Sequence, residues 1–390
     1  MTIPHSGPSP DGVLPAAAPP PDAVPAGSVP AGSVPADLGV VIVTFNAADV
    51  ILDCLESLLA APGVRLRIVV VDNASSDDTV ATLRNWASGA VPYAAPPDIP
   101  FALAAAPKPV TLHGPQRRDL PGPGLDGAAS LTLLETGVNG GFAAGVNHGL
   151  AHLAQIGSLD RFWVLNPDSV VPPATPAAFA RHPGGFALMG GRVNFLDTPD
   201  RIQIDGGLIN RWTGITGNVN LGASHAASPP PDPARLDFIT GASMVASRAF
   251  YEAAGPMAEE YFLYYEEVDW ALRRGALPLA YCPQGIVYHR AGTAIGSPRL
   301  DRMASPFSIY FKHRGRMRFM RRFHPAAVPA AYAYSFAKAA QIALQGYRAE
   351  ARALVLAALD RQPPAHVRAR LSPEAAALAF AAPRSGDAAK

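Results

Sequence analysis

The sequence predicts an α/β protein built on an open, mostly parallel central sheet flanked by helices. Apolar runs of strand length alternate with amphipathic stretches between residues 38 and 300, which is the pattern of βαβ units. The runs "LGVVIVTF" and "VRLRIVVVD" are apolar almost throughout, as expected for strands buried on both faces. Polar side chains follow directly after several of these predicted strands.

Residues 1–37 precede this pattern and are rich in proline and alanine, with the repeat "VPAGSVPAGSVPA". They hold too few large apolar groups to offset the entropy of ordering, so we predict a disordered tail. The first strand begins near Leu38. "AADVILDCLESLLAAPG" then predicts a helix, because its apolar residues share one stripe that ends at Pro62-Gly63. The second strand and a helix over "DDTVATLRNWA" follow.

Residues 88–129 interrupt the alternation with proline, alanine and glycine. Ordered loops of that length without secondary structure are uncommon, so we expect an inserted loop. "LTLLETGVNGGFAAGVNHGLAHLAQ" predicts a strand, a glycine-rich turn and a helix, and "RFWVLNPDSV" predicts a strand that ends in a polar turn. Residues 301–390 are basic and alanine-rich, and they predict a helical C-terminal region.

The composition limits the possible functions. The chain has 390 residues and a formal net charge of +1. A nucleic-acid-binding surface normally brings a strong basic excess, so we expect no nucleic-acid partner. Cys54 and Cys282 are too few for a disulfide framework or a zinc cluster, which favours a reducing compartment. A signal peptide and a membrane-spanning apolar run are not evident, so we expect a cytoplasmic protein.

Three predicted strands end in polar residues, and ligands bind beyond the carboxyl ends of parallel strands. These ends are Thr44-Phe45-Asn46, Asp72-Asn73 and Asn166-Pro167-Asp168. A turn or a helix cap would explain any one of them, because Asn, Asp and Pro favour such positions. Three ends of this kind favour one shared cleft.

Asp168 is also a candidate metal ligand, two residues after the amide oxygen of Asn166. Magnesium and manganese prefer oxygen ligands, often one or two carboxylates plus substrate phosphates. His289 follows a later apolar run and could add a nitrogen ligand, although a hydrogen-bonded histidine at a strand end explains it equally well. The turn "GVNGGFAAGVNHG" matches neither a dinucleotide fingerprint nor a P-loop. Its glycines either let backbone amides approach a diphosphate or allow a helix and a strand to pack tightly.

The stretch "YFLYYEEVDWALRRG" places three carboxylates, those of Glu266, Glu267 and Asp269, among aromatic and apolar residues. The acids stand at the start of a predicted helix and the arginines at its end, which suits the helix dipole. Asp269 can also pair with Arg273 at i,i+4 spacing. Helical geometry puts Glu267 about 100° from Glu266 and about 200° from Asp269, so one face cannot hold all three. At least one carboxylate is therefore left without an obvious helical partner.

Seven segments in order resemble family 2 glycosyltransferases with a GT-A fold, in particular their rhamnosyltransferase-like branch, which builds bacterial surface polysaccharides. The segments span about residues 38–293 and are "VVIVTFN", "VVVDNASSDDT", "NGGFAAGVNHG", "LNPDSV", "ITGASMVASRAFYEAAG", "YFLYYEEVDWALRRG" and "IVYHRAG". The resemblance implies a GT-A domain over residues 38–300. It also implies inverting transfer of a sugar, with rhamnose as the branch-level candidate, from a nucleotide-diphospho-sugar to a glycan or lipid-linked acceptor.

The resemblance implies roles for single residues as well. Asp168 stands at the metal-binding position of the Asp-x-Asp motif, which implies Mg²⁺ or Mn²⁺, and neutral Asn166 at its first position predicts weaker metal binding. Glu267 stands at the position of the catalytic base, with Glu266 and Asp269 beside it. The positions that match donor contacts are Thr44, Phe45, Asn46, Asp72, Asn73, Asn139, Gly140, Gly141, Asn147, Asn166 and Asp168.

The segment "YFKHRGRMRFMRRFHP" interleaves aromatic and basic residues after the predicted catalytic domain. It could dock on an anionic membrane surface, which would suit a lipid-linked acceptor, or pack as a helix on the domain. At most, we expect a peripheral contact with the inner face of the cytoplasmic membrane.

Two other functions are compatible with parts of the sequence. A nucleotidyltransferase also combines an α/β sheet with a metal-binding acid, but its usual glycine-rich loop with a basic residue near the first strand is missing. A non-catalytic glycan- or nucleotide-binding module would bind a donor without transfer, and the presence of Asp168 and Glu267 argues against it.

Overall fold

The computed structural model describes residues 36–114, 129–290 and 303–381. The chain divides into two units, Met1–Ser33 and Val34–Lys390, and every described residue belongs to the second. The predicted tail lies outside the described residues, apart from Ala36 and Asp37, which already belong to the first strand. Parts of the predicted insertion (115–128) and of the C-terminal region (301–302 and 382–390) also lie outside them.

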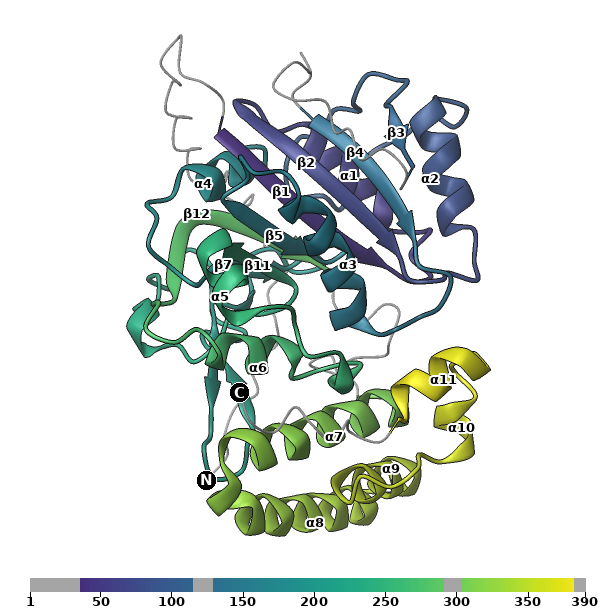
Figure 1. Cartoon of the computed structure of the whole chain (residues 1–390), viewed down its shortest axis with the longest axis vertical. Helices are drawn as coiled ribbons and strands as arrows, with labels where there is room; N and C mark the ends of the chain where they lie inside the picture. The colour runs from purple at the N-terminus through teal and green to yellow at the C-terminus, as the bar shows by residue number, and fades with distance from the viewer. Residues whose placement is uncertain (1–35, 115–128, 291–302, 382–390) are drawn as a thin grey trace, which may run out of the picture. The chain divides into compact units, whose positions relative to one another are not determined.

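Within the described residues, ten strands form one mixed sheet (Figure 1). The order is β3-β4-β2-β1-β5-β11-β7-β12-β6, and β8 pairs with β7 beside this path. Neighbours from β3 to β5 are parallel, as are β7 and β12, whereas β11, β8 and β6 run antiparallel to their partners. The strands are β1 Ala36–Thr44, β2 Val64–Asp72, β3 Leu112–His113, β4 Ala129–Glu135, β5 Arg161–Leu165, β6 Ser169–Val170, β7 Leu188–Phe195, β8 Ile202–Ile204, β11 Ser243–Ser247 and β12 Ala280–His289.

Helices cover both faces of this sheet, and further helices follow it. They are α1 Ile51–Leu59, α2 Thr79–Ser88, α3 Phe142–Ala154, α4 Thr175–Arg181, α5 Arg248–Ala254, α6 Glu266–Leu272, α7 Pro306–Phe323, α8 Val328–Leu344, α9 Arg348–Ala358, α10 Ala365–Arg368 and α11 Pro373–Ala379. Short 3₁₀ turns lie at η1 Pro233–Arg235, η2 Glu259–Tyr261 and η3 Pro325–Ala327, and β9 Gly207–Ile209 pairs with β10 Thr216–Asn218 as a separate hairpin.

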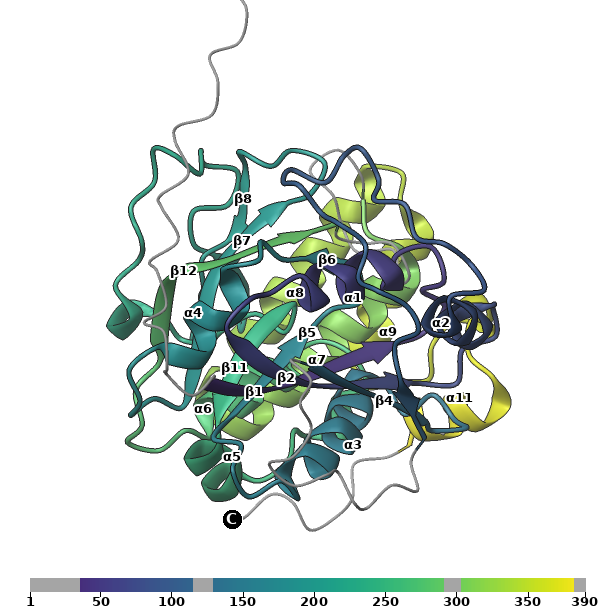
Figure 2. The ribbon, with the colours of Figure 1, turned by 90° about the horizontal axis from the view of Figure 1, so that it is seen from above.

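The central strands are apolar throughout because both of their faces are buried. Along β1, Val41 and Val43 belong to one hydrophobic core and Val40 and Ile42 to the other. Helices α1, α2 and α4 contribute to the second core, whereas α3, α5 and α6 contribute to the first. Figure 2 shows α1 and α3 on opposite sides of β1 and β2. The predicted fold class, a mostly parallel α/β sheet with a helical C-terminal region, is confirmed.

The basic and aromatic segment of the C-terminal region forms α7, which lies between α6 and the layer of α8 and α9 (Figure 1). Its central arginines are buried, with Arg314, Arg316 and Arg318 exposed by 4%, 1% and 9%. Arg316 donates to the carbonyl of Thr213 at 2.8 Å and to the hydroxyl of Ser335 at 2.5 Å. Of the two interpretations of this segment, the buried arginines support the packed helix, and Arg321 and Arg322 at its end are exposed.

The described part of the predicted insertion rests on α1. The hydroxyl of Tyr93 donates to Asp53 at 2.9 Å, and the ammonium of Lys108 pairs with buried Glu56 at 2.7 Å. The chain then adds β3 to the edge of the sheet beside β4. None of the helices in the described ranges is both long and apolar enough to cross a membrane.

Candidate active site

A pocket of about 480 Å³ opens at the carboxyl ends of the parallel strands. Four groups of residues line it: the strand ends, the glycine-rich turn before α3, the loop before α6, and parts of the C-terminal region. The predicted site residues among them are Phe45, Asn46, Asn73, Asn139, Gly141, Asn166, Asp168 and His289. The structure therefore brings the three polar strand ends to one cleft, as their common position in the sheet requires.

Thr44 and Asp72 lie side by side at the ends of β1 and β2, next in sequence to the pocket residues Phe45 and Asn73. Both side chains are buried. Among the described residues, the Thr44 hydroxyl and the Oδ1 atom of Asp72 have no hydrogen-bond partner. Buried polar atoms are normally paired, so these two atoms fit a polar ligand group that reaches the strand ends.

The two asparagines at the strand ends hold neighbouring turns. Asn46 adopts a left-handed backbone (φ 51°), and its Oδ1 atom accepts from the N–H of Ser76 at 2.8 Å. The amide of Asn73 donates to Asn139 Oδ1 at 3.1 Å and to the carbonyl of Gly141 at 2.9 Å. Asn73 therefore fixes the glycine-rich turn against the end of β2.

Gly140 and Asn147 line a different cavity, of about 870 Å³, which shares Asn73 with the pocket. The amide of Asn147 donates to the carbonyl of Met257 at 3.0 Å and to Glu259 at 2.8 Å, and its oxygen accepts from the Met257 N–H at 2.9 Å. These contacts hold the turn before η2. Asn147 is not among the described residues that line the first pocket, and its donor contact stays a prediction.

The predicted metal ligands meet at the end of β12. Nε2 of His289 lies 3.0 Å from Asp168 Oδ1 and 3.1 Å from the amide of Asn166. Nδ1 of His289 lies 2.9 Å from Gln203 Oε1. Because the side-chain oxygen of Gln203 only accepts, this contact holds the ring through its Nδ1–H group and turns Nε2 toward the other two groups.

The 3.0 Å spacing between Nε2 of His289 and the Asp168 carboxylate fits two neighbouring ligands of one cation as well as a direct contact between the two side chains. The outer contact with Gln203 orients the imidazole in the manner of histidines that bind metals. Within the described ranges, no three His, Cys, Asp or Glu side chains are grouped so that they could hold a metal ion. Asp168 and His289 would thus supply only part of a coordination shell, and substrate oxygens would complete it.

The loop before α6, residues 262–265, has an unusual backbone. Phe262, Tyr264 and Tyr265 have φ values of 63°, 67° and 76°, a left-handed region that costs bulky residues of order 1–3 kcal/mol each. We call residues 262–265 the acidic loop, because they lead into the acidic start of α6, and three contacts hold them. The Phe142 N–H donates to the Phe262 carbonyl at 2.9 Å, Tyr264 shares a hydrogen bond with the Ser308 hydroxyl at 2.8 Å, and Tyr265 donates to the Gly214 carbonyl at 2.7 Å.

Two glycines allow the acidic loop to approach its neighbours closely. A Cβ atom at Gly141 would lie 2.2 Å from the Phe262 carbonyl oxygen, and one at Gly315 on α7 would lie 2.6 Å from that of Tyr264. Gly141 also has a φ of 89°, which favours glycine. The glycine-rich turn and α7 therefore both contact the loop that leads into the acidic helix.

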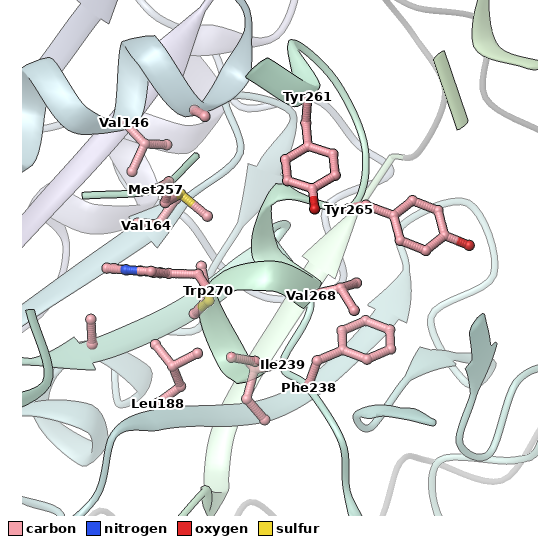
Figure 3. Close-up of a cluster of buried hydrophobic side chains, with 14 of the residues drawn as sticks. Val146, Val164, Leu188, Phe238, Ile239, Met257, Tyr261, Tyr265, Val268 and Trp270 are labelled. Atoms are coloured by element: carbon pink, nitrogen blue, oxygen red, sulfur yellow. The ribbon is translucent and has the colours of Figure 1, made fainter. Parts of the chain in front are cut away.

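Asp269 is completely buried and fully paired, among the apolar side chains around α6 that Figure 3 shows. Its carboxylate accepts from the Tyr261 hydroxyl at 3.0 Å and pairs with Arg273 at 2.8 Å and with Arg322 at 3.0 Å. The predicted i,i+4 pair with Arg273 is thus present. Because Arg322 belongs to α7, Asp269 links α6 to the C-terminal region.

The two glutamates differ in exposure. Glu266 is buried, and its Oε2 atom has no hydrogen-bond partner among the described residues. Burial and the neighbouring Glu267 carboxylate raise the pKa of Glu266 well above its ordinary value. Glu267 is partly exposed. Burial raises its pKa too, although backbone N–H groups and the Lys312 ammonium partly offset the shift.

Glu267 is not among the described residues that line the pocket, whereas Phe262 and Leu263 of the loop before α6 are. A Cβ atom placed on Gly241 would lie 3.9 Å from the Cβ atom of Glu267 and 3.3 Å from the ring of Phe142, which lines the pocket. The pKa of each glutamate is raised, and Glu267 is the more exposed of the two side chains. Environments that separate two neighbouring carboxyls in this way are typical of acid–base sites.

Sequence reasoning missed several residues that line the pocket or support it: Gln203, Arg290, Phe307, Arg370 and Leu371. Arg290 directly follows His289, so the strand end that predicted the histidine could also have indicated the arginine. For Phe307, Arg370 and Leu371 we find no such signal, because they reach the pocket only through the packing of the C-terminal helices.

Comparison with known proteins bears on the class of this chain. Residues 39–97 match the model of glycosyl transferase family 2, a stretch that includes the ends of β1 and β2. A comparison with curated protein sequences found no match. The fold, the pocket and the family match define a glycosyltransferase, as predicted from the sequence; the rhamnosyltransferase-like branch stays a prediction.

Similar solved structures include three that contain a nucleotide or a nucleotide sugar. A mannosyltransferase from Pyrobaculum calidifontis, with GDP-Man and Mn²⁺, is 15% identical, with 83% of this chain and 86% of that chain covered and a TM-score of 0.46. TarS of S. aureus with UDP-GlcNAc is 13% identical, with coverages of 88% and 89% and a TM-score of 0.40. Glucosyl-3-phosphoglycerate synthase from Mycobacterium tuberculosis, with Mn²⁺, UDP and phosphoglyceric acid, is 14% identical, with coverages of 71% and 77% and a TM-score of 0.36. With TM-scores this low, these similarities carry no argument about this chain.

Proposed function

We propose that this chain is an inverting glycosyltransferase that moves a sugar from a nucleotide-diphospho-sugar to a hydroxyl of a glycan or lipid-linked acceptor. One observation carries the proposal: Asp168, His289 and the ends of β1 and β2 converge on one pocket, whose wall includes Phe262 and Leu263 of the loop that leads to Glu267, a carboxyl of raised pKa. The nucleoside would occupy the strand ends, where the Thr44 hydroxyl and the Oδ1 atom of Asp72 have no hydrogen-bond partner in the part of the chain that the structure describes. The resemblance to the rhamnosyltransferase-like branch suggests rhamnose and a role in bacterial surface polysaccharide synthesis.

A divalent ion, Mg²⁺ or Mn²⁺, fits Asp168 and His289. When bound, such an ion neutralises the charge that develops on a departing diphosphate. The chain's own residues prepare the position: Gln203 fixes the imidazole, and the Arg290 N–H donates to the Asp168 carbonyl at 3.0 Å. Asn166 contributes no charge, so we expect the ion to be held more weakly than by two carboxylates.

Glu267 would act as the general base. Its carboxylate takes the proton of the acceptor hydroxyl while that oxygen attacks the anomeric carbon from the face opposite the nucleotide. The bond between this carbon and the diphosphate oxygen breaks, the diphosphate keeps the electron pair, and the configuration inverts. A raised carboxyl pKa suits this role, because a base works best when its pKa lies near the working pH.

The sharpest test is Glu267→Gln, with Glu252→Gln on α5 as a control whose side chain is 61% exposed. We expect transfer by Glu267→Gln to fall by about 10²–10⁴-fold, with unchanged donor affinity, and the control to match wild type. Transfer that survives in Glu267→Gln with normal donor binding would show that the base is a different group. A thermal-shift screen of nucleotide sugars, dTDP-rhamnose included, with and without Mn²⁺ identifies the donor, since a bound ligand raises apparent stability.

For a lipid-linked acceptor, we propose a peripheral membrane contact at the inner face of the cytoplasmic membrane through α8. Five of its exposed residues lie within an arc of about 80°, and none of these five is charged: Pro329, Ala333, Phe336, Ala340 and Leu344. Phe336 and Leu344 are 44% and 89% exposed. Arg352 lines an apolar groove beside Phe336, and residues 303–381 carry 12 Lys and Arg against 3 Asp and Glu. Apolar and cationic groups together favour an anionic bilayer.

Vesicle sedimentation tests this contact. Wild type should sediment with phosphatidylcholine vesicles that contain phosphatidylglycerol, and less with phosphatidylcholine alone. Phe336→Glu with Leu344→Glu should abolish binding, whereas Leu208→Glu, at a side chain that is also 44% exposed, should not. A wild-type protein that stays in the supernatant at low salt would refute the contact. Loss of a dimer in the double variant would assign the face to a second copy instead.

A further inference from the structure

We infer that Lys312, a residue of α7, is the counter-ion of Glu267 and a positioning residue for the proposed base. This inference rests on the proposed function and assigns a role in the reaction to a side chain of the C-terminal helices. It is carried by the face of α7 on which Lys312 lies, by the contacts that fix this part of the helix, and by the charges around the two side chains.

Lys312 lies on the face of α7 that contacts the acidic loop. Residues at i, i+4 and i+7 of a helix share one face, and Ser308, Lys312 and Gly315 have this spacing. Ser308 shares a hydrogen bond with the Tyr264 hydroxyl at 2.8 Å. A Cβ atom at Gly315 would lie 2.6 Å from the Tyr264 carbonyl oxygen and 3.4 Å from the Tyr265 ring. Lys312 therefore stands between two contacts with the residues that lead into α6.

The part of α7 that carries Lys312 is fixed on both sides. Before it, the Phe311 ring packs against that of Phe262, with their centroids 5.0 Å apart. After it, Arg316 donates to the Thr213 carbonyl at 2.8 Å. Packing thus sets the position of the lysine stem, and its charge acts on the start of α6 from a defined place.

Glu267 and Lys312 act on each other's charge without a close ion pair. Among the described residues, no hydrogen bond or ion pair joins the two side chains, although the Lys312 ammonium favours the Glu267 carboxylate. A nearby cation lowers the free-energy cost of a buried carboxylate. It does so here without occupying the oxygen that takes the proton of the acceptor hydroxyl, as a direct ion pair would.

Several other groups that titrate or carry charge surround this pair. They belong to the acidic loop, α6, α7 and α8 and are Tyr265, Glu266, His313, Arg316, Tyr334 and Lys338. Burial, together with nearby cations, lowers the pKa of His313 well below its ordinary value, so this ring is neutral. Burial raises the pKa of Glu266 and of Tyr265, which favours their uncharged forms.

The two members of the pair stabilise each other's charged form. Burial lowers the pKa of Lys312, Glu267 opposes that shift, and Arg316 adds to it. Without the lysine charge, Glu267 would stay in the same buried surroundings and keep its proton to higher pH. Below that range, fewer molecules would hold the carboxylate that takes the acceptor proton.

Lys338 on α8 provides a matched control. It is a lysine of the neighbouring helix, and its ammonium donates to the Gln341 side chain at 3.0 Å. Among the described residues, its charge is not one of those that act on Glu267. Methionine at either position removes one positive charge from the C-terminal helices and keeps a side chain of similar length, but only Lys312→Met removes the counter-ion.

The experiment measures the charge of Glu267 and the reaction separately, for wild type, Lys312→Met, Lys312→Arg and Lys338→Met. In the full chain labelled with ¹³C at the glutamate carboxyls, the Glu267 carbon is the resonance that Glu267→Gln lacks, and its titration is followed by NMR. Release of nucleotide from UDP-glucose, GDP-mannose and dTDP-rhamnose, with water as the acceptor and Mn²⁺ in excess, is measured at about pH 6 and about pH 8.

We expect the midpoint of the Glu267 titration to move to higher pH in Lys312→Met. Lys312→Arg keeps the charge and Lys338→Met keeps the counter-ion, so both should titrate as wild type. A close opposite charge corresponds to about tenfold or more in the ionisation of a carboxyl. Lys312→Met should therefore release nucleotide about tenfold more slowly than wild type at about pH 6, with a smaller deficit at about pH 8.

Each other outcome overturns the inference in a recognisable way. A wild-type midpoint in Lys312→Met would exclude the counter-ion while leaving the proposed function intact, and a rate loss of equal size at both pH values would then show a structural role. An equal shift in Lys338→Met would point to the general charge of the C-terminal helices.

The two measurements also separate this inference from the proposed function. If Glu267→Gln releases nucleotide as wild type does while the midpoint shifts in Lys312→Met, the two charges are paired but Glu267 is not the base, and the positioning role fails with the proposed function. If wild type releases nucleotide from none of the three sugars, the proposed function loses its support, whereas the titration still decides whether Lys312 is the counter-ion.

Discussion

Replacement of Gly315 by alanine tests whether α7 sets the position of the acidic loop. The new Cβ atom would lie 2.6 Å from the Tyr264 carbonyl oxygen, whereas ordinary contacts start at 3.4 Å, so about 0.8 Å of separation must be regained. Helix α7 resists a shift, because Arg314 and Met317 on both sides of Gly315 are buried. The left-handed loop around Tyr264 is the part that yields, and with it the start of α6.

Two opposing effects on stability can be estimated for this substitution. Overpacking costs about 1–3 kcal/mol, while replacing glycine inside a helix returns about 1 kcal/mol. The free energy of unfolding should therefore fall by only about 0–2 kcal/mol. Catalysis is more sensitive, because a displacement of about 1 Å at the reacting groups can cost about 100-fold in rate. We therefore expect a large loss of kcat in a protein that remains folded.

The assay compares kcat, donor affinity and urea unfolding for wild type, Gly315→Ala and Gly157→Ala. Gly157 is the matched control, since a Cβ there meets no atom within 4 Å. We expect Gly315→Ala to lose about 100-fold in kcat with unchanged donor affinity, and Gly157→Ala to behave as wild type. Full kcat in a folded Gly315→Ala protein would refute the idea that α7 positions the acidic loop. So would a loss of donor affinity as large as the loss of kcat.

Three further substitutions test single contacts. The raised pKa of Glu266 means that the folded chain keeps a proton which the unfolded chain releases above about pH 4.5, so the stability of the protein falls as the pH rises. Glu266→Gln should therefore raise the free energy of urea unfolding at pH 8 but not at pH 4. An equal effect at both pH values would contradict the raised pKa. Asp269→Asn leaves two arginines without their buried partner and should cost about 3 kcal/mol, and a loss below about 1 kcal/mol in the same assay would mean that the network is dispensable. Gln203→Leu releases the ring of His289 and should weaken Mn²⁺ binding by about 10- to 100-fold, as followed by electron paramagnetic resonance; unchanged binding would exclude His289 as an oriented ligand.

The strand ends show what a sequence can predict about this fold. An apolar run followed by Asn or Asp identifies a buried strand and its polar end from neighbouring residues alone. The parallel sheet then brings Asn46, Asn73 and Asp168 to one edge without further information. The choice of Glu267 over Glu266 is different, because helical spacing separates the two side chains but does not say which one faces a ligand. Family resemblance suggested Glu267, and the different burial of the two side chains supports it.

The contribution of the C-terminal region could not be predicted in the same way. The arginines of α7 appear in the sequence as a basic surface, but carbonyl groups far away in the chain, such as that of Thr213, are their partners. The left-handed backbone at Phe262 and Tyr264 has no sequence signal, since bulky side chains rarely adopt it. Arg370 lines the pocket through the packing of the C-terminal helices, which local patterns do not indicate.

One helix supports both sides of the proposed reaction. At its start, α7 places Phe307 in the donor pocket and Ser308 against Tyr264, and near its end Arg322 pairs with Asp269 of α6. A shift of α7 would therefore change donor contacts and the position of Glu267 together. Removal of residues 303–381 would also expose the sheet-side core where Met317, Phe319 and Met320 of α7 are fully buried. The sheet and the C-terminal helices thus form one folding unit. Substitutions of Glu267 or of donor-pocket residues should therefore be measured in a chain that retains both parts.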